Sequence, residues 1–301
     1  MYTILAICLA SICSIEPSID PSKVELQPTE KQLLYAEQLF DVRIYNPSIL
    51  EYKRFLFYQP HTEMADFARY RIAQAHYYQG NRTYSQQLFR AFMETFPESR
   101  LYHHAQLMLG KTHLDDGEYA TARSAFFRIL QAKGNKRLQV QAQYLRGWCY
   151  LHDRNWFKAI SEFRDIRQLR GENSDIGSFD ARLERTAIKL ADTTLASTPL
   201  PLKSPKLAQL LSTVVPGSGQ IYAGKTRNGL ISLGINAAFI YLLGDSVAEK
   251  RYVDAVGIFL VGSRFYWGNR HNAKKWAMEH NRDLEMGLIE RLKTIEREAI
   301  E

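Results

Sequence analysis

A pattern of small and aromatic side chains that returns every 37 residues constrains this 301-residue chain more than any other feature. A small residue recurs in each unit, a second small residue follows twelve positions later, and an aromatic residue stands four positions after that. The members of the three sets are Ala36, Ala73, Gly110 and Gly147; Ser48, Ser85, Ala122 and Ala159; and Tyr52, Phe89, Phe126 and Phe163. Self-similarity at a fixed period of this length predicts stacked helical units.

The residue types indicate how each unit folds. Only Gly, Ala or Ser lets two helix backbones approach closely, so we expect the first small residue to face the second across a helix–turn–helix hairpin. The aromatic residue should fill the groove against the next unit. Gly80 and Gly117 stand where the first helices should end in a left-handed residue. Pro60 and Pro97 should end the second helices.

Residues 31–170 resemble the tetratricopeptide repeat. The resemblance is carried by Leu109, Gly110, Gly117, Glu118, Tyr119, Ala122 and Phe126 in one unit, and by Gly147, Tyr150, Trp156, Ala159 and Phe163 in the next. The family period is about 34 residues, so longer helices or loops must absorb the excess here. The resemblance implies a curved all-α solenoid whose inner surface, lined by the first helices, grips peptides or partner proteins. A generic helical bundle is the alternative.

Six first-helix residues are candidates for this partner-binding groove, although solvated surface is the other interpretation of each. They are Arg69, Gln74, Tyr77, His103, Lys111 and Gln143. A further helix over 179–195 should cap the stack, so that residues 31–195 form the repeat region. Residues 196–206 contain three prolines and indicate a linker.

The segment 207–270 is apolar and predicts a helical hairpin in a membrane. Gly229–Gly244 carries no charge, and its extension to Ala248 reaches the roughly 17–20 residues that a spanning helix needs. Glu249-Lys250-Arg251 would form the turn, and Val253–Gly262 would return. A soluble hydrophobic helical domain is the alternative. The charged, amphipathic tail 271–301 is expected to lie on a surface.

Gly219–Thr226 matches G-x-x-x-x-G-K-[ST], the pattern of a phosphate-binding loop. Such a loop needs a buried strand before it and a helix after it, so that backbone amides surround the phosphates. The short remainder of the chain favours helices rather than the further strands of a parallel sheet. Nucleotide binding is therefore kept only as an alternative.

The same residues fit a second motif better. They resemble P-G-x-G-Q-x-Y-x-G-[RK]-x-x-x-G, which recurs in bacterial membrane proteins of poorly defined function, often behind tetratricopeptide repeats. The matching residues are Pro216, Gly217, Gly219, Gln220, Tyr222, Gly224, Lys225 and Gly229, with further matches at 203–205, 265–269 and 280–282. The resemblance covers about 203–282 and implies a membrane location but no reaction. Tyr222 would lie at the headgroup level, with Lys225 and Arg227 near lipid phosphates.

Residues 1–14 are apolar and uncharged, and Pro17 and Pro21 follow them. This pattern predicts a short signal peptide and hence a periplasmic location for the repeats, with an ordinary apolar helix as the alternative. Of the three cysteines, two lie in this segment, so no disulfide framework or metal site is expected.

Composition excludes several function classes. A net charge of +7 without a basic run gives no support for nucleic-acid binding. No catalytic set, metal cluster or cofactor site is expected. The leading hypothesis is a non-catalytic scaffold or adaptor on a bacterial membrane, which binds proteins or peptides during envelope assembly or transport. The alternatives are a nucleotide-binding enzyme and a soluble repeat protein whose apolar tail docks on a partner.

Overall fold

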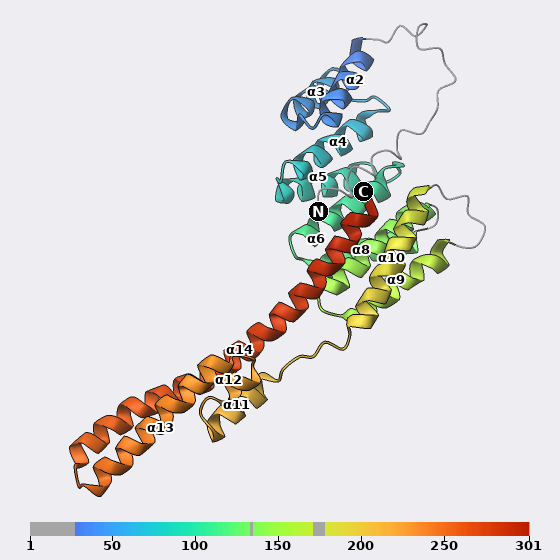
Figure 1. Cartoon of the computed structure of the whole chain (residues 1–301). Coiled ribbons are helices and arrows are strands. Elements are labelled where there is room, and N and C mark those ends of the chain that lie inside the picture. Colours follow the sequence, from blue (N-terminus) through green and yellow to red (C-terminus); the bar gives the residue numbers. More distant parts are fainter. Residues whose placement is uncertain (1–27, 133–134, 171–177, 301) are drawn as a thin grey trace. The chain divides into compact units, whose positions relative to one another are not determined.

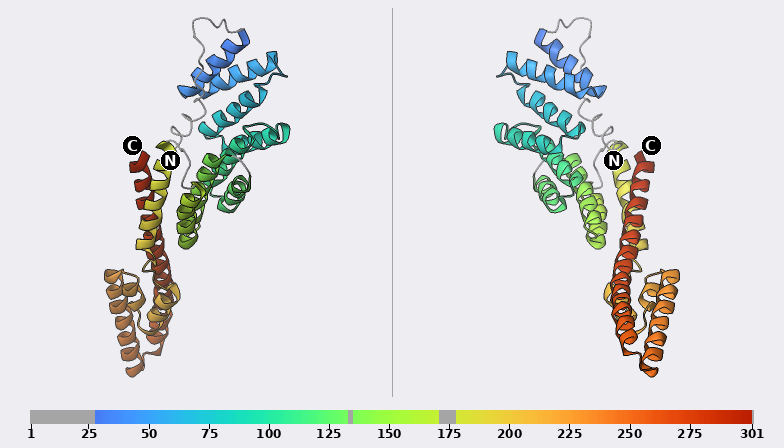
Figure 2. Two further views of the ribbon diagram at one scale, coloured as in Figure 1. Left: turned by 90° about the vertical axis from the view of Figure 1, so that its right-hand side faces the viewer. Right: turned by 90° about the vertical axis from the view of Figure 1, so that its left-hand side faces the viewer.

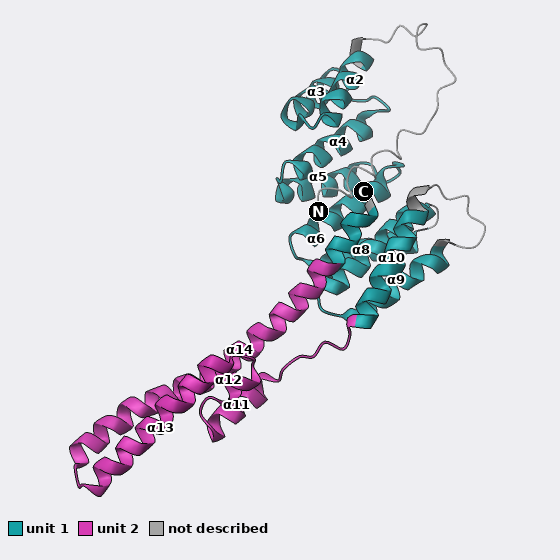
Figure 3. Cartoon of the chain, viewed as in Figure 1, with its two compact units in different colours: residues 1–196, 292–301 teal, residues 197–291 magenta. Residues whose placement is uncertain are grey.

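The computed structural model describes residues 28–132, 135–170 and 178–300, which form helices and turns with no strand among them. The expected all-helical fold is thereby confirmed for this part of the chain. The predicted signal peptide, residues 1–14, lies outside it. The chain divides into two compact units, residues 1–196 with 292–301 and residues 197–291 (Figure 3).

In the described residues, the first unit consists of four helical hairpins, one further helix and the C-terminal end of the last helix (Figure 1). The hairpins pair α2 (Pro28–Asp41) with α3 (Tyr45–Tyr58), α4 (Ala65–Tyr78) with α5 (Arg82–Thr95), α6 (Tyr102–Asp115) with α7 (Tyr119–Gln131), and α8 (Lys136–His152) with α9 (Trp156–Arg170). Helix α10 (Ser178–Ser197) follows. Each hairpin is one 37-residue unit of the sequence pattern.

The small residues of each unit meet as the sequence predicts. The Ser48 hydroxyl donates to the Ala36 carbonyl at 2.9 Å, and the Ser85 hydroxyl donates to the Ala73 carbonyl at 2.8 Å. The aromatic residue also lies against the next unit as predicted, since Phe126 shares a core cluster with Leu138 and Ala142 of α8. It packs on the small residue of its own unit as well, because a Cβ added at Gly110 would lie 2.5 Å from Phe126 Cε1.

The turn inside each hairpin contains a left-handed residue, and these four residues are also 37 positions apart. They are Arg43, Gly80, Gly117 and Arg154, with φ between 59° and 85°. In each turn the next residue donates its N–H to a carbonyl five residues back, as Asn81 does to His76, which is the Schellman ending of a helix. The sequence identified only the two glycines, because arginine gives no signal for this conformation.

The second unit contains α11 (Pro205–Val214), α12 (Ser218–Tyr222), α13 (Thr226–Ala248) and the greater part of α14 (Tyr252–Ile300). Helices α13 and α14 lie side by side as an antiparallel hairpin (Figures 1 and 2). The rings of Phe239 and Phe265 are 5.5 Å apart between them. The second apolar stretch and the charged tail form one continuous helix, whereas the sequence suggested a division near residue 270.

Candidate protein-binding and membrane surfaces

The first helices of neighbouring hairpins are joined by polar contacts. The Tyr77 hydroxyl of α4 donates to the Asp115 carboxylate of α6 at 2.5 Å. Gln74, one turn before Tyr77, donates from Nε2 to the Tyr70 hydroxyl at 2.9 Å. Lys111 lies one turn before Asp115 and is largely buried. We call these five residues the first-helix face.

Burial controls the protonation of this face. It raises the pKa of Asp115, while the hydrogen bond from Tyr77 and the charges of Lys111 and Arg82 act in the opposite direction. Burial and the adjacent Asp115 carboxylate raise the pKa of Tyr77 well above its ordinary value. The tyrosine therefore stays a neutral donor. Tyr70, Gln74, Tyr77 and Lys111 are at most 9% exposed, so these side chains mainly join neighbouring hairpins and present only a narrow polar edge to a peptide.

Three of the six groove candidates, Gln74, Tyr77 and Lys111, belong to the first-helix face. The other three lie elsewhere. The Arg69 guanidinium lies 5.7 Å from the ring centroid of Phe96 at the end of α5, and His103 lies beside Gln106 on its own helix. Gln143 lies on α8, outside the first-helix face, and is nearly as buried as Gln74, with 6% and 3% of the two residues exposed.

Helix α8 contributes two residues that the sequence analysis did not select. Tyr144 donates its hydroxyl proton to the Glu296 carboxylate near the end of α14 at 2.6 Å. Trp148 is buried beside them, and its indole Nε1 has no hydrogen-bond partner in the described part of the chain. The repeat register gives the missing signal, because Trp148 stands 37 residues after Lys111 and 74 after Gln74.

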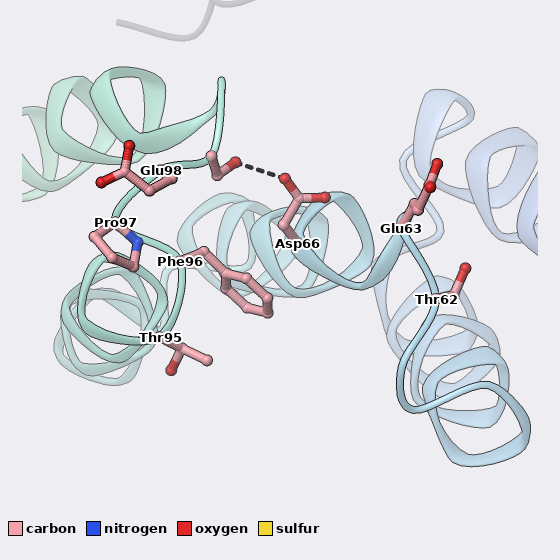
Figure 4. Close-up of a pocket in the computed structure, with 8 residues that line it drawn as sticks. Thr62, Glu63, Asp66, Thr95, Phe96, Pro97 and Glu98 are labelled. Carbon is pink, nitrogen blue, oxygen red and sulfur yellow. Dashed lines mark hydrogen bonds between the residues drawn. The ribbon is translucent and has the colours of Figure 1, made fainter.

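A hollow of about 450 Å³ lies beside the first turn of α4 and the loop between α5 and α6 (Figure 4). Its lining includes Asp66 and Phe96. One Asp66 oxygen accepts from the Ser99 hydroxyl at 2.5 Å and the other from the Phe67 amide at 2.6 Å. The Asp66 carboxylate is therefore already satisfied by the protein and is not free to hold a ligand.

Reactive groups are scarce in the described residues. They contain no group of three or more His, Cys, Asp or Glu side chains placed to hold a metal ion. Burial raises the pKa of the Cys149 thiol to about 12, so this cysteine remains protonated at neutral pH. A protonated, buried thiol is a poor nucleophile.

The glycine motif of the second unit forms a tight crossing of three helices. A Cβ added at Gly219 would lie 1.9 Å from the Ala208 carbonyl oxygen of α11. Gly217 has φ of 100°, and a Cβ there would lie 2.2 Å from the Gly229 carbonyl oxygen of α13. Glycine is therefore required at both positions, because backbone occupies the space of a side chain.

The polar residues of the motif complete this crossing. Gln220 is fully buried; its Oε1 accepts from the Ser212 hydroxyl at 2.8 Å, and its Nε2 donates to the Asn269 carbonyl at 3.3 Å. The Tyr222 hydroxyl accepts from the Ser204 amide at 3.0 Å. Parts of the sequence more than 60 residues apart thus meet in one hydrogen-bonded core, which we call the motif core.

The remaining motif residues frame this core. Pro216 is half-buried before the left-handed Gly217, and Gly224 has φ of 88° between α12 and α13. Lys225 and Arg227 are exposed at the start of α13. Both positive charges are therefore accessible to an external partner.

The phosphate-loop geometry is absent from Gly219–Thr226. Residues 205–214, where a strand would be needed, form α11. The Gly219 amide donates to the Ser212 hydroxyl, and the amides of Ala223, Gly224 and Lys225 donate to carbonyls of the same turn. Amides that are already engaged cannot surround a phosphate.

Helix α13 is, among the described helices, the one long and apolar enough to cross a membrane. It has 23 residues, and its most apolar 18-residue window has a mean hydropathy of 1.6 with only 11% of that window buried. At 1.5 Å per residue it is about 34 Å long, close to the thickness of a bilayer's hydrocarbon core. Length and composition alone make this weak evidence.

Together these features define an all-helical repeat protein without a recognisable catalytic centre in its described residues. The tetratricopeptide repeat family matches residues 70–137 and 107–174, so this region contains tetratricopeptide repeats. Such repeats generally serve as protein-interaction scaffolds and are typically non-catalytic.

Solved structures similar to the chain include two tetratricopeptide repeat proteins. A tetratricopeptide repeat protein from Parabacteroides merdae is 15% identical, over 88% of this chain and 98% of its own, with a TM-score of 0.42. The C-terminal part of a repeat-containing protein from Cytophaga hutchinsonii is also 15% identical, over 82% and 98%, with a TM-score of 0.29. No curated protein sequence matches the chain significantly.

Proposed function

We propose that this chain is a non-catalytic scaffold of the bacterial envelope, which holds proteins or peptides on its repeats and is attached to a membrane by the α13–α14 hairpin. The arrangement of polar and apolar side chains in the hairpin carries the membrane part of the proposal. The repeat family and the polar first-helix face carry the protein-binding part.

The hairpin has polar groups inside and apolar groups outside. Ser232 of α13 donates to the Asn269 side-chain oxygen of α14 at 2.9 Å, and buried Asn236 donates to the Ser232 carbonyl at 2.8 Å. Large apolar side chains are at least 50% exposed on both helices, including Leu230, Ile231, Ile240, Val253, Val256, Phe259 and Leu260. This inverted pattern costs free energy in water and is favourable in lipid.

Charges gather at the turn of the hairpin, away from the exposed apolar stretch. Arg251 contacts Asp245 at 2.6 Å, Glu249 at 2.8 Å and Asp254 at 3.3 Å. A group of charges that must stay hydrated suits the end of a membrane hairpin rather than its middle. Exposed Trp267 lies in the part of α14 where an interfacial aromatic residue is expected.

The motif core gives Tyr222 a structural role, because its hydroxyl holds the Ser204 amide. Exposed Lys225 and Arg227 remain candidates for contact with lipid phosphates. We place the repeats in the periplasm on the pattern of residues 1–14, and envelope protein assembly or transport is the process that suits a scaffold there.

The test is isolation of the tagged full-length chain from cells after chemical cross-linking. We expect the chain in the membrane fraction after an alkaline carbonate wash, with discrete proteins cross-linked to residues of the repeats. A chain that the wash releases would favour the soluble repeat protein whose apolar tail docks on a partner. A washed, membrane-bound chain without cross-linked proteins would contradict the scaffold role.

A further inference from the structure

We propose that Tyr144 and Trp148 of α8 form a docking site for an amphipathic helix that carries glutamate one turn after an apolar residue, and that residues 292–300 occupy this site as a tethered competitor. The inference deepens the proposed function, because it identifies the partner chemistry of one repeat and the segment that controls access to it.

The contact between the segment and the repeats is polar at its centre. Residues 292–301 are grouped with the repeats rather than with the rest of α14. Glu296 accepts the Tyr144 hydroxyl proton at 2.6 Å, and Glu298 lies 3.8 Å from Lys189 of α10. The red end of α14 runs beside the yellow α10 in Figure 2. Two carboxylates on one short segment thus meet two different helices of the repeat unit.

The segment presents one buried face. Leu292 is fully buried, and Glu296 lies one turn after it on the same side of the helix. Lys293 and Glu298 lie on other sides, and Glu298 is 61% exposed in its side chain. The pattern that the site selects is therefore Leu-x-x-x-Glu on an amphipathic helix.

The site retains an unused donor. Tyr144 is 2% exposed and Trp148 is 5% exposed, yet the Trp148 indole N–H has no hydrogen-bond partner among the described residues. A buried donor without a partner costs free energy, so an acceptor that reached it would bind more tightly. The segment satisfies Tyr144, and the Trp148 indole lies near the Glu296 carboxyl group without a well-formed hydrogen bond, so a helix that placed its acceptor closer to Trp148 would fit better.

Tethering explains how a weakly fitted segment can keep the site closed. Because the segment belongs to the same chain as the site, its docking is intramolecular and competes with a free helix of equal affinity without depending on the protein concentration. A partner with the same pattern binds when the segment is displaced or when its own contacts are better. Access to the site is then controlled by release of the segment, and the conformation of the repeats does not need to change.

The experiment measures binding of a fluorescein-labelled synthetic peptide of residues 286–301 in mild detergent. The receptors are the full chain, a chain that ends after Arg291, and the full chain with Leu292→Asp. We expect the peptide to bind the shortened chain and the Leu292→Asp chain at least tenfold more tightly than the full chain. Circular dichroism verifies that each receptor is helical, and Leu292→Asp serves if the shortened chain does not fold.

Matched variant peptides distinguish the specific Glu296 contact from non-specific binding. Glu296→Ala should weaken binding about tenfold, whereas Glu298→Ala, which removes an exposed carboxylate of the same segment, should change it less than twofold. In a receptor with Tyr144→Phe, the Glu296→Ala effect should nearly vanish, because the two groups are coupled. The proposal would be overturned if the peptide bound the full and shortened chains equally, or if it did not bind a folded receptor whose own segment is removed or displaced. Equal effects of the two alanine peptides would overturn it as well. These outcomes need no membrane and no outside partner, so they leave the proposed function untouched.

Discussion

Glycine is required for different physical reasons in the two units of the chain. In the repeats, Gly110 and Gly147 leave space for an aromatic ring of the same hairpin. In the motif core, Gly217 and Gly219 leave space for backbone atoms. The second case is less tolerant, because a ring can shift by some tenths of an ångström whereas a helix backbone moves only with its whole element.

Gly219→Ala should therefore destabilise the second unit by about 3 kcal/mol or more, since the new methyl group overlaps the Ala208 carbonyl oxygen. Gly234→Ala, in the same unit with nothing within 4 Å of an added Cβ, should be neutral or slightly stabilising. Thermal unfolding of both variants in detergent gives the comparison. Equal melting temperatures would show that the close helix crossing does not exist.

Residue patterns predict contacts only where the chain repeats them. The pairing of Ser48 with Ala36 follows from a period that the sequence displays four times. Arg43 and Arg154 were missed in the left-handed turns because arginine adopts that conformation only when the rest of the turn requires it. The contact of Asn281 with Lys203, at 2.7 and 2.9 Å, was also hidden, since no period connects residues so far apart.

At the scale of elements, the end of α14 shows how an ionisable residue can control docking of a helix. Burial raises the pKa of Glu296 above its ordinary value of 4.5, while hydrogen bonding to Tyr144, the nearby Trp148 indole and the charge of Lys293 act against this rise. Docking consequently favours the protonated carboxyl group. Its contribution is complete below pH 4.5 and is lost as the pH rises through the higher pKa of the docked state.

The peptide of residues 286–301 should thus bind the open receptor more tightly at pH 4.5 than at pH 7.5, and the loss of affinity should begin near pH 4.5 and end above the raised pKa of the docked state. A Glu296→Gln peptide should lose this dependence. The comparison also shows whether the pH dependence of binding comes from Glu296 or from His152, whose ring centroid lies 6.1 Å from that of Trp148. Fluorescence anisotropy across this range provides the measurement, and parallel curves for the two peptides would assign the dependence to another group.

At the scale of the whole molecule, the two units differ in which side chains they bury and which they expose. The repeats bury aromatic residues such as Phe89 and Phe126 and expose charges, as expected in water. The hairpin buries amides and exposes leucine, isoleucine and valine. The sequence predicted both classes from periodicity and apolar length, but it could not show that the polar residues of α13 face α14, because that depends on the hairpin's register.

Ile240→Arg should weaken membrane attachment, because a charge near the centre of a spanning helix costs about 2.5–3.5 kcal/mol on insertion. Ile240 is 69% exposed, so the substitution creates no clash inside the unit. Phe157→Arg on α9, also an exposed apolar position, is the matched control and should leave attachment unchanged. Carbonate extraction followed by immunoblotting compares the two, and equal retention of both variants would argue against lipid contact at α13.

The most direct test of the scaffold account compares two charge-removing substitutions in the full chain. Lys111→Met changes the first-helix face, and Arg128→Met changes an exposed position on the second helix α7. Quantitative mass spectrometry of proteins co-isolated from cross-linked membranes should show specific partners reduced at least fivefold by Lys111→Met and retained by Arg128→Met. Identical sets of partners for wild type and both folded variants would contradict partner binding on the first-helix face.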